Sequence, residues 1–131
     1  MKLGYTILYV NDIKSTAEFY QKAFKLEINF MDEKGYVEFK TGETALAFAS
    51  YDFISNFLPD VFKILSKRKK VCCFEIAFIT DDVEESYNHA INAGAISITE
   101  PHEQYWGQTV SYVKDINGFL VEISSPVRTP V

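Results

Sequence analysis

The chain has 131 residues, which fits one domain or two small halves and excludes large multidomain enzymes. Hydrophobic residues make up 47% and charged residues 24%, a balance typical of a folded globular protein and too apolar for disorder. The net charge of -5 argues against nucleic-acid binding, because phosphate contacts require clustered Lys and Arg. The one basic run, over residues 67–70, is interpreted as a solvated linker or helix end.

We expect neither a targeting signal nor a membrane span in this chain. Its longest uncharged apolar run lies near residues 71–78 and is broken by Glu75, whereas a membrane span needs about 20 apolar residues. The N-terminal apolar stretch has no small-residue cleavage site and meets Asp12 too early for a signal peptide. Cys72 and Cys73 are adjacent, so a disulfide between them would be strained and we expect free thiols. We therefore expect a cytoplasmic protein with no membrane or nucleic-acid partner.

The first half of the chain predicts a strand, a helix and three further strands. Residues 3–10 are rich in β-branched and aromatic types, which favours a strand. Asp12 is a good helix N-cap, and an apolar stripe at helical spacing predicts a helix over 13–24. The stripe consists of Ile13, Ala17, Tyr20 and Phe24. Three strand-like runs follow, separated by turn sequences, over residues 26–30, 36–40 and 44–49.

The second half repeats this order. Residues 72–80 predict a strand, Asp82 a helix N-cap, and Gly94 the left-handed residue that ends the helix. The apolar stripe of this helix consists of Val83, Tyr87, Ala90 and Gly94. Three strands follow over residues 96–98, 109–113 and 119–124, the last two joined at the Asn117-Gly118 hairpin signal.

The two halves match in register, which indicates an internal repeat. Equivalent residues lie 70 positions apart. The matching pairs are Tyr5 and Glu75, Asp12 and Asp82, Thr16 and Ser86, Ala23 and Ala93, and Ile28 and Ile98. A repeat of this kind decides the fold, so we predict a first module over 1–56, a connector with a short amphipathic helix over 57–70, and a second module over 71–131, together forming one structural domain.

Several motifs resemble the vicinal oxygen chelate family, which includes glyoxalase I, bleomycin-resistance proteins and extradiol dioxygenases. The run VNDIKSTAEFYQKAFKLEI is similar to the helix signature of that family, and the segment KDINGFLVEISSP to its Asp-Pro-Asp-Gly-Asn hairpin and closing Ile-Glu-Leu strand. The resemblance covers roughly residues 3 to 126. One departure is Lys25, where the family usually has Gly after the first helix, so we expect that helix to end differently.

The resemblance implies an α+β fold in which two βαβββ modules form a mixed, curved sheet around a groove, usually in a homodimer. Metal-dependent members supply two ligands from each half, one on the first strand and one on the last. Carried over residue by residue, these positions are Tyr5 and Ala47 in the first half and Glu75 and Glu122 in the second.

The residues at these positions form a poor metal site. Strand alternation places Ala47, Glu75 and Glu122 on the side away from the helices. A divalent transition metal needs three or four donors, Ala47 offers none, and a phenol such as that of Tyr5 binds poorly near neutral pH. His102, in the predicted loop before the seventh strand, is the one imidazole expected to reach the groove, whereas His89 should lie on the exposed side of its helix. The sequence therefore leaves the identity of any cofactor undecided. It disfavours a divalent metal bound by Glu75, Glu122 and His102.

A binding function follows from the same residues. Two carboxylates in one cleft repel each other unless a cation lies between them, and that cation could be a metal, a basic ligand group, or a side chain such as Arg128 or Lys40. Trp106 and Tyr112 either line the ligand site or fill the core. The residues expected to contact a ligand are Tyr5, Ala47, Glu75, His102, Trp106 and Tyr112, with Glu122 as the catalytic candidate.

We therefore predict a small-molecule-binding protein of the glyoxalase and bleomycin-resistance type, acting as a homodimer. The alternatives are a metal-dependent lyase, isomerase or dioxygenase of the glyoxalase type, and a scaffold whose exposed faces bind another protein.

Overall fold

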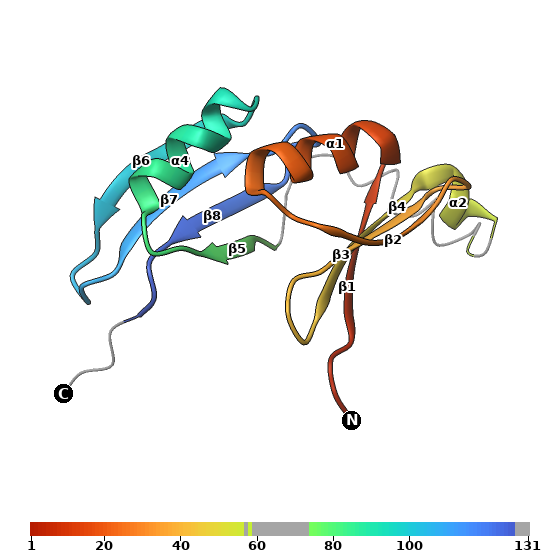
Figure 1. Cartoon of the computed structure of the whole chain (residues 1–131), viewed down its shortest axis with the longest axis horizontal. Helices are drawn as coiled ribbons and strands as arrows, with labels where there is room; N and C mark the ends of the chain where they lie inside the picture. Colours follow the sequence, from red (N-terminus) through yellow and green to blue (C-terminus); the bar gives the residue numbers. More distant parts are fainter. Residues whose placement is uncertain (57, 59–73, 128–131) are drawn as a thin grey trace. The chain divides into compact units, whose positions relative to one another are not determined.

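The computed structural model describes residues 1–56, 58 and 74–127. The chain forms two compact units, Met1–Val71 and Cys72–Val131, whose elements are labelled in Figure 1. Almost all of the predicted connector, with its expected helix and basic run, lies outside the described residues, as do Cys72, Cys73 and Arg128. In the part of the chain that the structure describes, no helix has both the length and the apolar character of a membrane span.

The first unit contains a four-stranded mixed sheet in the order β1-β4-β3-β2. Its elements are β1 (Tyr5–Val10), α1 (Ile13–Phe24), β2 (Ile28–Asp32), β3 (Tyr36–Phe39), β4 (Ala45–Ser50) and α2 (Tyr51–Ser55). β1 runs parallel to β4, and the other neighbours are antiparallel. α1 packs against β3 and β4.

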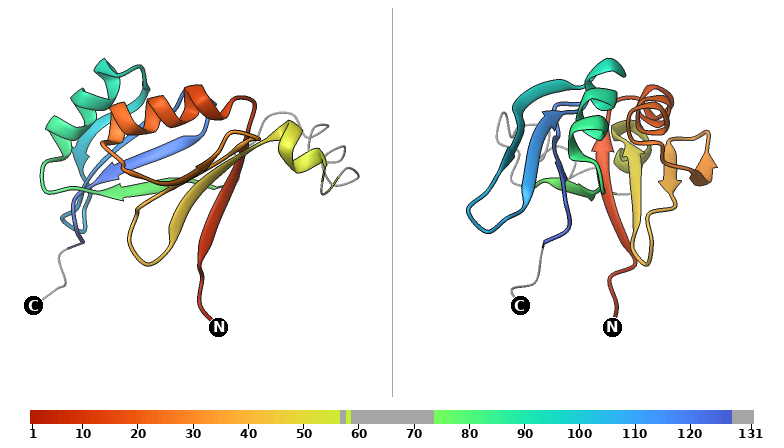
Figure 2. Two further views of the ribbon diagram at one scale, coloured as in Figure 1. Left: turned by 45° about the vertical axis from the view of Figure 1, so that its right-hand side comes forward. Right: turned by 60° about the vertical axis from the view of Figure 1, so that its left-hand side comes forward.

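The second unit repeats this topology, with the strand order β5-β8-β7-β6. Its elements are β5 (Ile76–Ile79), α4 (Val83–Asn92), β6 (Ile96–Glu103), β7 (Thr109–Lys114) and β8 (Leu120–Ser124). β5 runs parallel to β8, and α4 packs against β6, β7 and β8. Figure 2 shows α4 lying across one face of its sheet. The predicted α+β fold of two βαβββ modules is confirmed.

Both long helices begin at the predicted aspartates. The side chain of Asp12 accepts a hydrogen bond from the backbone N–H of Ser15 at 2.9 Å, and that of Asp82 accepts one from Glu85 at 3.1 Å. Each bond satisfies one of the backbone donors that a helix N-terminus leaves free. The second helix ends as predicted, with Gly94 just beyond it in the left-handed region at φ 115°.

Two elements differ from the sequence prediction. β6 continues to Glu103, so His102 lies in a strand and its placement in a loop was wrong. β6 is an edge strand, which tolerates a proline, and one of its two register shifts, between Thr99 and His102, spans Pro101. α2, which the sequence did not predict, begins where the Ser50 hydroxyl accepts a hydrogen bond from the Phe53 N–H at 3.1 Å.

The two units have cores of different composition. In the first unit an aromatic cluster lies between α1 and the sheet, with Tyr20, Phe39 and Phe48 completely buried. The ring centroids of Tyr20 and Phe48 are 4.6 Å apart. In the second unit small aliphatic side chains such as Val113 and Val121 fill the equivalent space. Both of these cores lie on the helix side of their sheet.

α1 was expected to end differently from the family because Lys25 stands where glycine is usual, and this expectation was wrong. This lysine adopts the left-handed conformation itself, at φ 55° and ψ 32°, and its backbone N–H donates to the carbonyl of Tyr20. The helix therefore ends with the backbone conformation usual for glycine at this place, at a steric cost of about 1–2 kcal/mol for a residue with a Cβ.

Replacing this lysine should stabilise the protein. Lys25→Gly relieves the strain but makes the unfolded chain more flexible, so we expect a net gain of about 0.5–1 kcal/mol in the free energy of unfolding. Urea denaturation followed by circular dichroism measures the change. Gln21→Gly, in the right-handed interior of the same helix, is the control and should lose about 1 kcal/mol. A loss of stability in both variants would contradict the prediction.

Candidate functional site

In the first unit, three strands bring the predicted positions to the sheet face away from α1. Ala47 on the central strand β4 is paired with Ile7 of β1 on one side and with Glu38 of β3 on the other. Tyr5, two residues before Ile7, shares this face and is 56% exposed. Ala47 itself is completely buried, so its contribution to the face is the absence of a larger side chain.

Glu38 is a candidate that the sequence prediction missed. Its Oε1 accepts a hydrogen bond from the Tyr36 hydroxyl at 2.9 Å, and its Oε2 accepts one from Asn29 Nδ2 at 2.6 Å. Burial, together with the bonded Glu38 carboxylate, raises the pKa of Tyr36 to about 12. The sequence signal that could have identified Glu38 is the alternation of apolar and polar residues in YVEF. Val37 and Phe39 are buried, so Tyr36 and Glu38 lie on the opposite face of the strand.

In the second unit, Glu122 occupies the corresponding central strand, β8. It is paired with Ala77 of β5 and with Tyr112 of β7, whose hydroxyl donates to Glu122 Oε1 at 3.3 Å. Glu75 lies one residue before β5, on the same face as Ala77 by strand alternation. The structure therefore brings together three residues that the sequence predicted, Glu75, Tyr112 and Glu122.

The electrostatics of this cluster are unfavourable for charge on Glu122. Burial raises the pKa of the Glu122 carboxyl, the negative charge of Glu75 raises it further, and the hydrogen bond from Tyr112 partly offsets both effects. Burial and the same two carboxylates raise the pKa of Tyr112, which stays protonated at neutral pH. Excess negative charge on this face is the condition under which a bound cation becomes favourable.

This cluster should make stability depend on pH. Below the ordinary carboxyl pKa, Glu122 is neutral in both the folded and unfolded chain, so it carries no penalty. As the pH rises through the raised folded pKa, the folded state must ionise a group that burial and Glu75 disfavour, and stability is lost. Glu122→Gln should therefore match the wild type near pH 4 and exceed its unfolding free energy by about 0.5 kcal/mol near pH 7, a value reduced by solvent screening.

Urea denaturation at the two pH values measures this difference. Glu100→Gln, which removes an exposed glutamate on β6, is the matched control and should show no change with pH relative to the wild type. An advantage of Glu122→Gln that is largest at low pH would reverse the sign and contradict the argument.

The other predicted residues lie elsewhere in the second unit. His102 is exposed on β6, and its ring nitrogens lie 3.0 Å from the Glu100 carbonyl oxygen and 3.2 Å from Gln104 Nε2. Trp106 is 45% exposed in the turn between β6 and β7 and donates from Nε1 to Gln108 at 2.8 Å, so the interpretation as a core residue was wrong. His89 is exposed, as predicted.

Lys40 was a candidate to neutralise the paired glutamates of the second half. In the structure its Nζ lies 2.6 Å from Glu27 Oε1, and both side chains are more than half exposed. Its ion pair therefore lies within the first unit.

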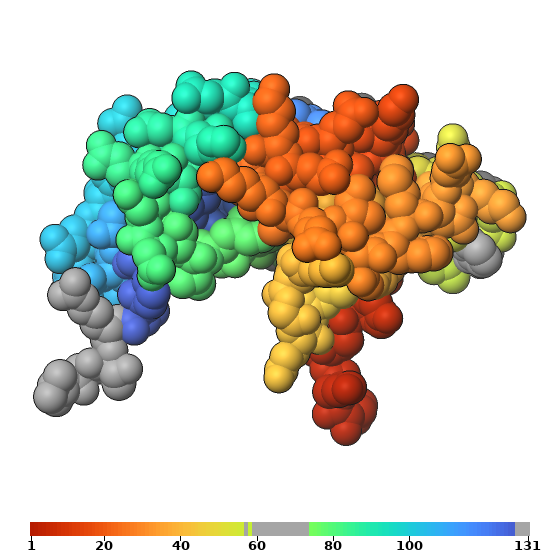
Figure 3. Space-filling view, in the orientation of Figure 1, coloured from red at the N-terminus to blue at the C-terminus, as the bar shows by residue number. Residues whose placement is uncertain are grey.

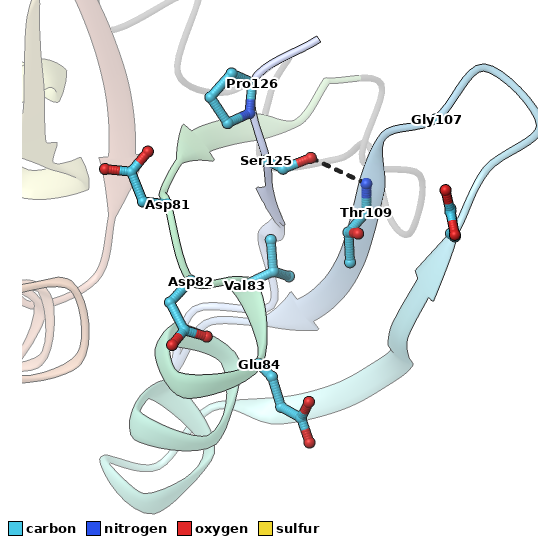
Figure 4. Close-up of a pocket in the computed structure, with 9 residues that line it drawn as sticks. Asp81, Asp82, Val83, Glu84, Gly107, Thr109, Ser125 and Pro126 are labelled. Atoms are coloured by element: carbon cyan, nitrogen blue, oxygen red, sulfur yellow. Dashed lines mark hydrogen bonds between the residues drawn. The ribbon is translucent and has the colours of Figure 1, made fainter. Parts of the chain in front are cut away.

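A pocket of about 560 Å³ also lies in the second unit (Figure 4). It is lined by Asp81, Asp82, Val83, Glu84, Glu103, Gly107, Thr109, Ser125 and Pro126. Several of its polar groups serve the fold, since Asp82 caps α4 and the Thr109 N–H donates to Ser125 Oγ at 3.0 Å. The pocket contains none of the residues predicted to bind a ligand.

The donor set does not fit a divalent metal. The four positions equivalent to family ligands carry a phenol, a methyl group and two carboxylates. Across residues 1–56, 58 and 74–127, no three or more His, Cys, Asp or Glu side chains are grouped so that they could hold a metal ion. Three donors are the minimum that catalytic zinc sites use.

Comparisons with known proteins agree with this architecture. A family model described as a glyoxalase-like domain matches residues 3–128. The uncharacterized protein YraH of Bacillus subtilis (strain 168) is 29% identical over 125 residues, which cover 94% of this chain and 97% of YraH.

Solved structures show the same fold at lower sequence identity. A glyoxalase/bleomycin resistance protein/dioxygenase family enzyme from Burkholderia phytofirmans PsJN superposes with a TM-score of 0.83 and 20% identity, over 98% of this chain and 100% of that one. The hypothetical protein SA1046 from S. aureus gives a TM-score of 0.77 and 20% identity, over 96% of this chain and 94% of that one.

Proposed function

Because the chain belongs to the glyoxalase-like domain family, we propose that it binds a small molecule with a cationic group on an aromatic framework, without a metal. The observation that carries this proposal is the cluster in the second unit, where Glu122 is half-buried beside Glu75 and hydrogen-bonded to Tyr112. A ligand cation between the two carboxylates removes their repulsion and lowers the pKa of Glu122 back towards its ordinary value.

Aromatic side chains support the second part of the proposal. Tyr112 places its ring on the same face as Glu122, and the exposed Tyr105 and Trp106 form an edge-to-face pair with ring centroids 4.8 Å apart. Tyr105 is 95% exposed and Trp106 45%, far more than packing in a core allows. Exposed aromatic rings provide flat surfaces for an aromatic ligand and attract cations through their faces.

Isothermal titration calorimetry against a panel of aromatic amidines, guanidines and amines, each with an uncharged analogue, tests this function. We expect binding of the cations but not of the analogues, and a loss of about tenfold or more in affinity in Glu122→Gln, because a charge-assisted hydrogen bond is removed. Affinity should also fall as the pH drops through the raised pKa of Glu122. The control is Glu100→Gln. No affinity for any cation in the panel, or equal affinity in the two variants, would refute the proposal.

The second candidate function is a metal-dependent lyase, isomerase or dioxygenase, which the carboxylates at two of the four family ligand positions favour. In that case Glu122 would be both a metal ligand and a proton-transfer group. Elemental analysis of protein loaded with zinc, nickel, manganese or iron separates the two functions. If the protein binds its ligand without a metal, both the wild type and Glu122→Gln should contain less than one metal ion per chain. Treatment with a chelator should then leave the affinity for the ligand unchanged. One metal per chain, lost in Glu122→Gln, would favour the enzyme.

A further inference from the structure

Each unit has a glutamate in the same cross-strand pair of its sheet, between the third and fourth strands of the module. The glutamate lies on the fourth strand in the second unit and on the third strand in the first unit. In the second unit the carboxylate is Glu122 of β8, opposite the phenol of Tyr112 on β7. In the first unit the equivalent position on β4 is Ala47, and the carboxylate comes from Glu38, directly opposite on β3. A tyrosine hydroxyl donates to the carboxylate in both units. The first unit therefore keeps a tyrosine–glutamate hydrogen bond, but its tyrosine is Tyr36, two residues before Glu38 on β3, and its family ligand position is an alanine.

Glu38 is held in a fixed orientation and still has hydrogen-bonding capacity. Tyr36 and Asn29 each donate to one of its two oxygens, at 2.9 and 2.6 Å. An ionised carboxylate offers about four acceptor positions, so about two remain for a further donor. Within the residues that the structure describes, Glu38 takes part in no ion pair. A planar cation with two N–H groups matches these remaining acceptors.

The surroundings of Glu38 suit an aromatic carrier for that cation. Ala47 has only a methyl group, so no long side chain rises from β4 beside the carboxylate. Phe30 is paired with Glu38 in the sheet, is 54% exposed, and has its ring centroid 6.2 Å from that of Tyr36. Ile7, on the other side of Ala47, is 45% exposed. Small-molecule sites combine apolar and aromatic side chains with a few precisely placed polar groups, and the residues around Glu38 offer that combination.

We propose that the first unit contains its own cation-binding site, in which Glu38 accepts two hydrogen bonds from an amidinium or guanidinium group and Phe30 and Tyr36 contact the attached aromatic ring. This inference rests on the proposed function only for the charge of the ligand, since the residues that form the site are different.

Benzamidine titration followed by two-dimensional NMR tests the site. In the wild type, benzamidine should shift the Asn29 side-chain amide and the Ala47 methyl signal. In Glu38→Gln both shifts should require about tenfold more benzamidine, because the cation loses its charged acceptor. Glu43→Gln, which removes an exposed glutamate of the β3–β4 turn, is the matched control and should behave as the wild type. Unchanged shifts of Asn29 and Ala47 in Glu38→Gln would overturn the inference.

Two further variants keep the outcome interpretable. Glu38→Asp retains the charge and should shift both signals more weakly than the wild type but more strongly than Glu38→Gln, even if the amide variant perturbs the sheet. Phe30→Ala keeps Glu38 and removes the exposed ring proposed to contact the ligand, and should reduce the affinity for benzamidine but not for the smaller guanidinium ion. Equal effects of Phe30→Ala on both probes would contradict the role of Phe30.

The same titration separates this inference from the proposed function. Binding in the second unit is followed at the ring signals of Tyr112 and in Glu122→Gln, whereas binding in the first unit is followed at Asn29 and Ala47 and in Glu38→Gln. Shifts confined to Tyr112 would support the proposed function and refute the site at Glu38. Shifts confined to Asn29 and Ala47 would do the reverse.

Discussion

Gly35→Ala is expected to lower the free energy of unfolding by roughly 3 kcal/mol, through backbone strain and overpacking together. Gly35 lies in the turn between β2 and β3 at φ 134°, a conformation that residues with a side chain rarely adopt. A Cβ at this position would lie 2.3 Å from Ser50 Oγ and 2.8 Å from Phe53 Cβ. Both distances are far shorter than van der Waals contact, so one of these groups must move.

The neighbours of Gly35 have little freedom to move. Ser50 Oγ accepts the hydrogen bond from the Phe53 N–H that begins α2, and the Ser50 N–H donates to the Gly35 carbonyl at 2.8 Å. Relief of the clash would therefore break the cap of α2 or the contact between the turn and β4. Either change removes a hydrogen bond from a partly buried position, which adds to the cost.

Gly42→Ala is the matched control for this prediction. Gly42 also has a positive φ, 107°, but an added Cβ would meet nothing within 4 Å. It belongs to the turn between β3 and β4, which projects from the body of the first unit (Figure 3). We expect a loss of about 1 kcal/mol, from strain alone. Chemical denaturation measures both variants, and equal losses would show that contact with Ser50 and Phe53 adds nothing.

Local signals account for the parts of the fold that the sequence predicted. α1 has the predicted bounds because Asp12 caps it and its apolar stripe has helical spacing, and both features lie within a few neighbouring residues. α2 was missed because its N-cap, Ser50, is also the last residue of β4, so the strand pattern hides the start of the helix. The extension of β6 through Pro101 depends on pairing with β7, which neighbouring residues do not reveal.

Part of the candidate site was predicted from the family resemblance. Glu75 and Glu122 were predicted because the family resemblance implies ligand positions there, and strand alternation placed both on the side away from the helices. Glu38 was missed because it matches no family ligand position and gains its role only from register, which places it opposite Ala47. Register between strands depends on turn geometry and packing, so a single strand pattern does not reveal it.

Phe48→Ala should have the largest effect of any core substitution in the first unit, a loss of about 4 kcal/mol in the free energy of unfolding. Phe48 is completely buried on the central strand β4, with its ring centroid 4.6 Å from Tyr20 and 6.1 Å from Phe39. Truncation removes the apolar surface of the ring and leaves a cavity between α1 and the sheet. Tyr20 and Phe39 are themselves completely buried, so they have little room to fill it.

Phe48→Leu is the control for this last prediction, because it keeps most of the apolar volume while it removes the aromatic contacts. We expect a loss of about 1–1.5 kcal/mol, so the difference between the two variants measures the cavity. Urea denaturation with an unchanged m-value validates the comparison, since a changed slope would indicate a changed unfolded state. Equal losses in the two variants would mean that ring contacts, rather than filled volume, stabilise this core.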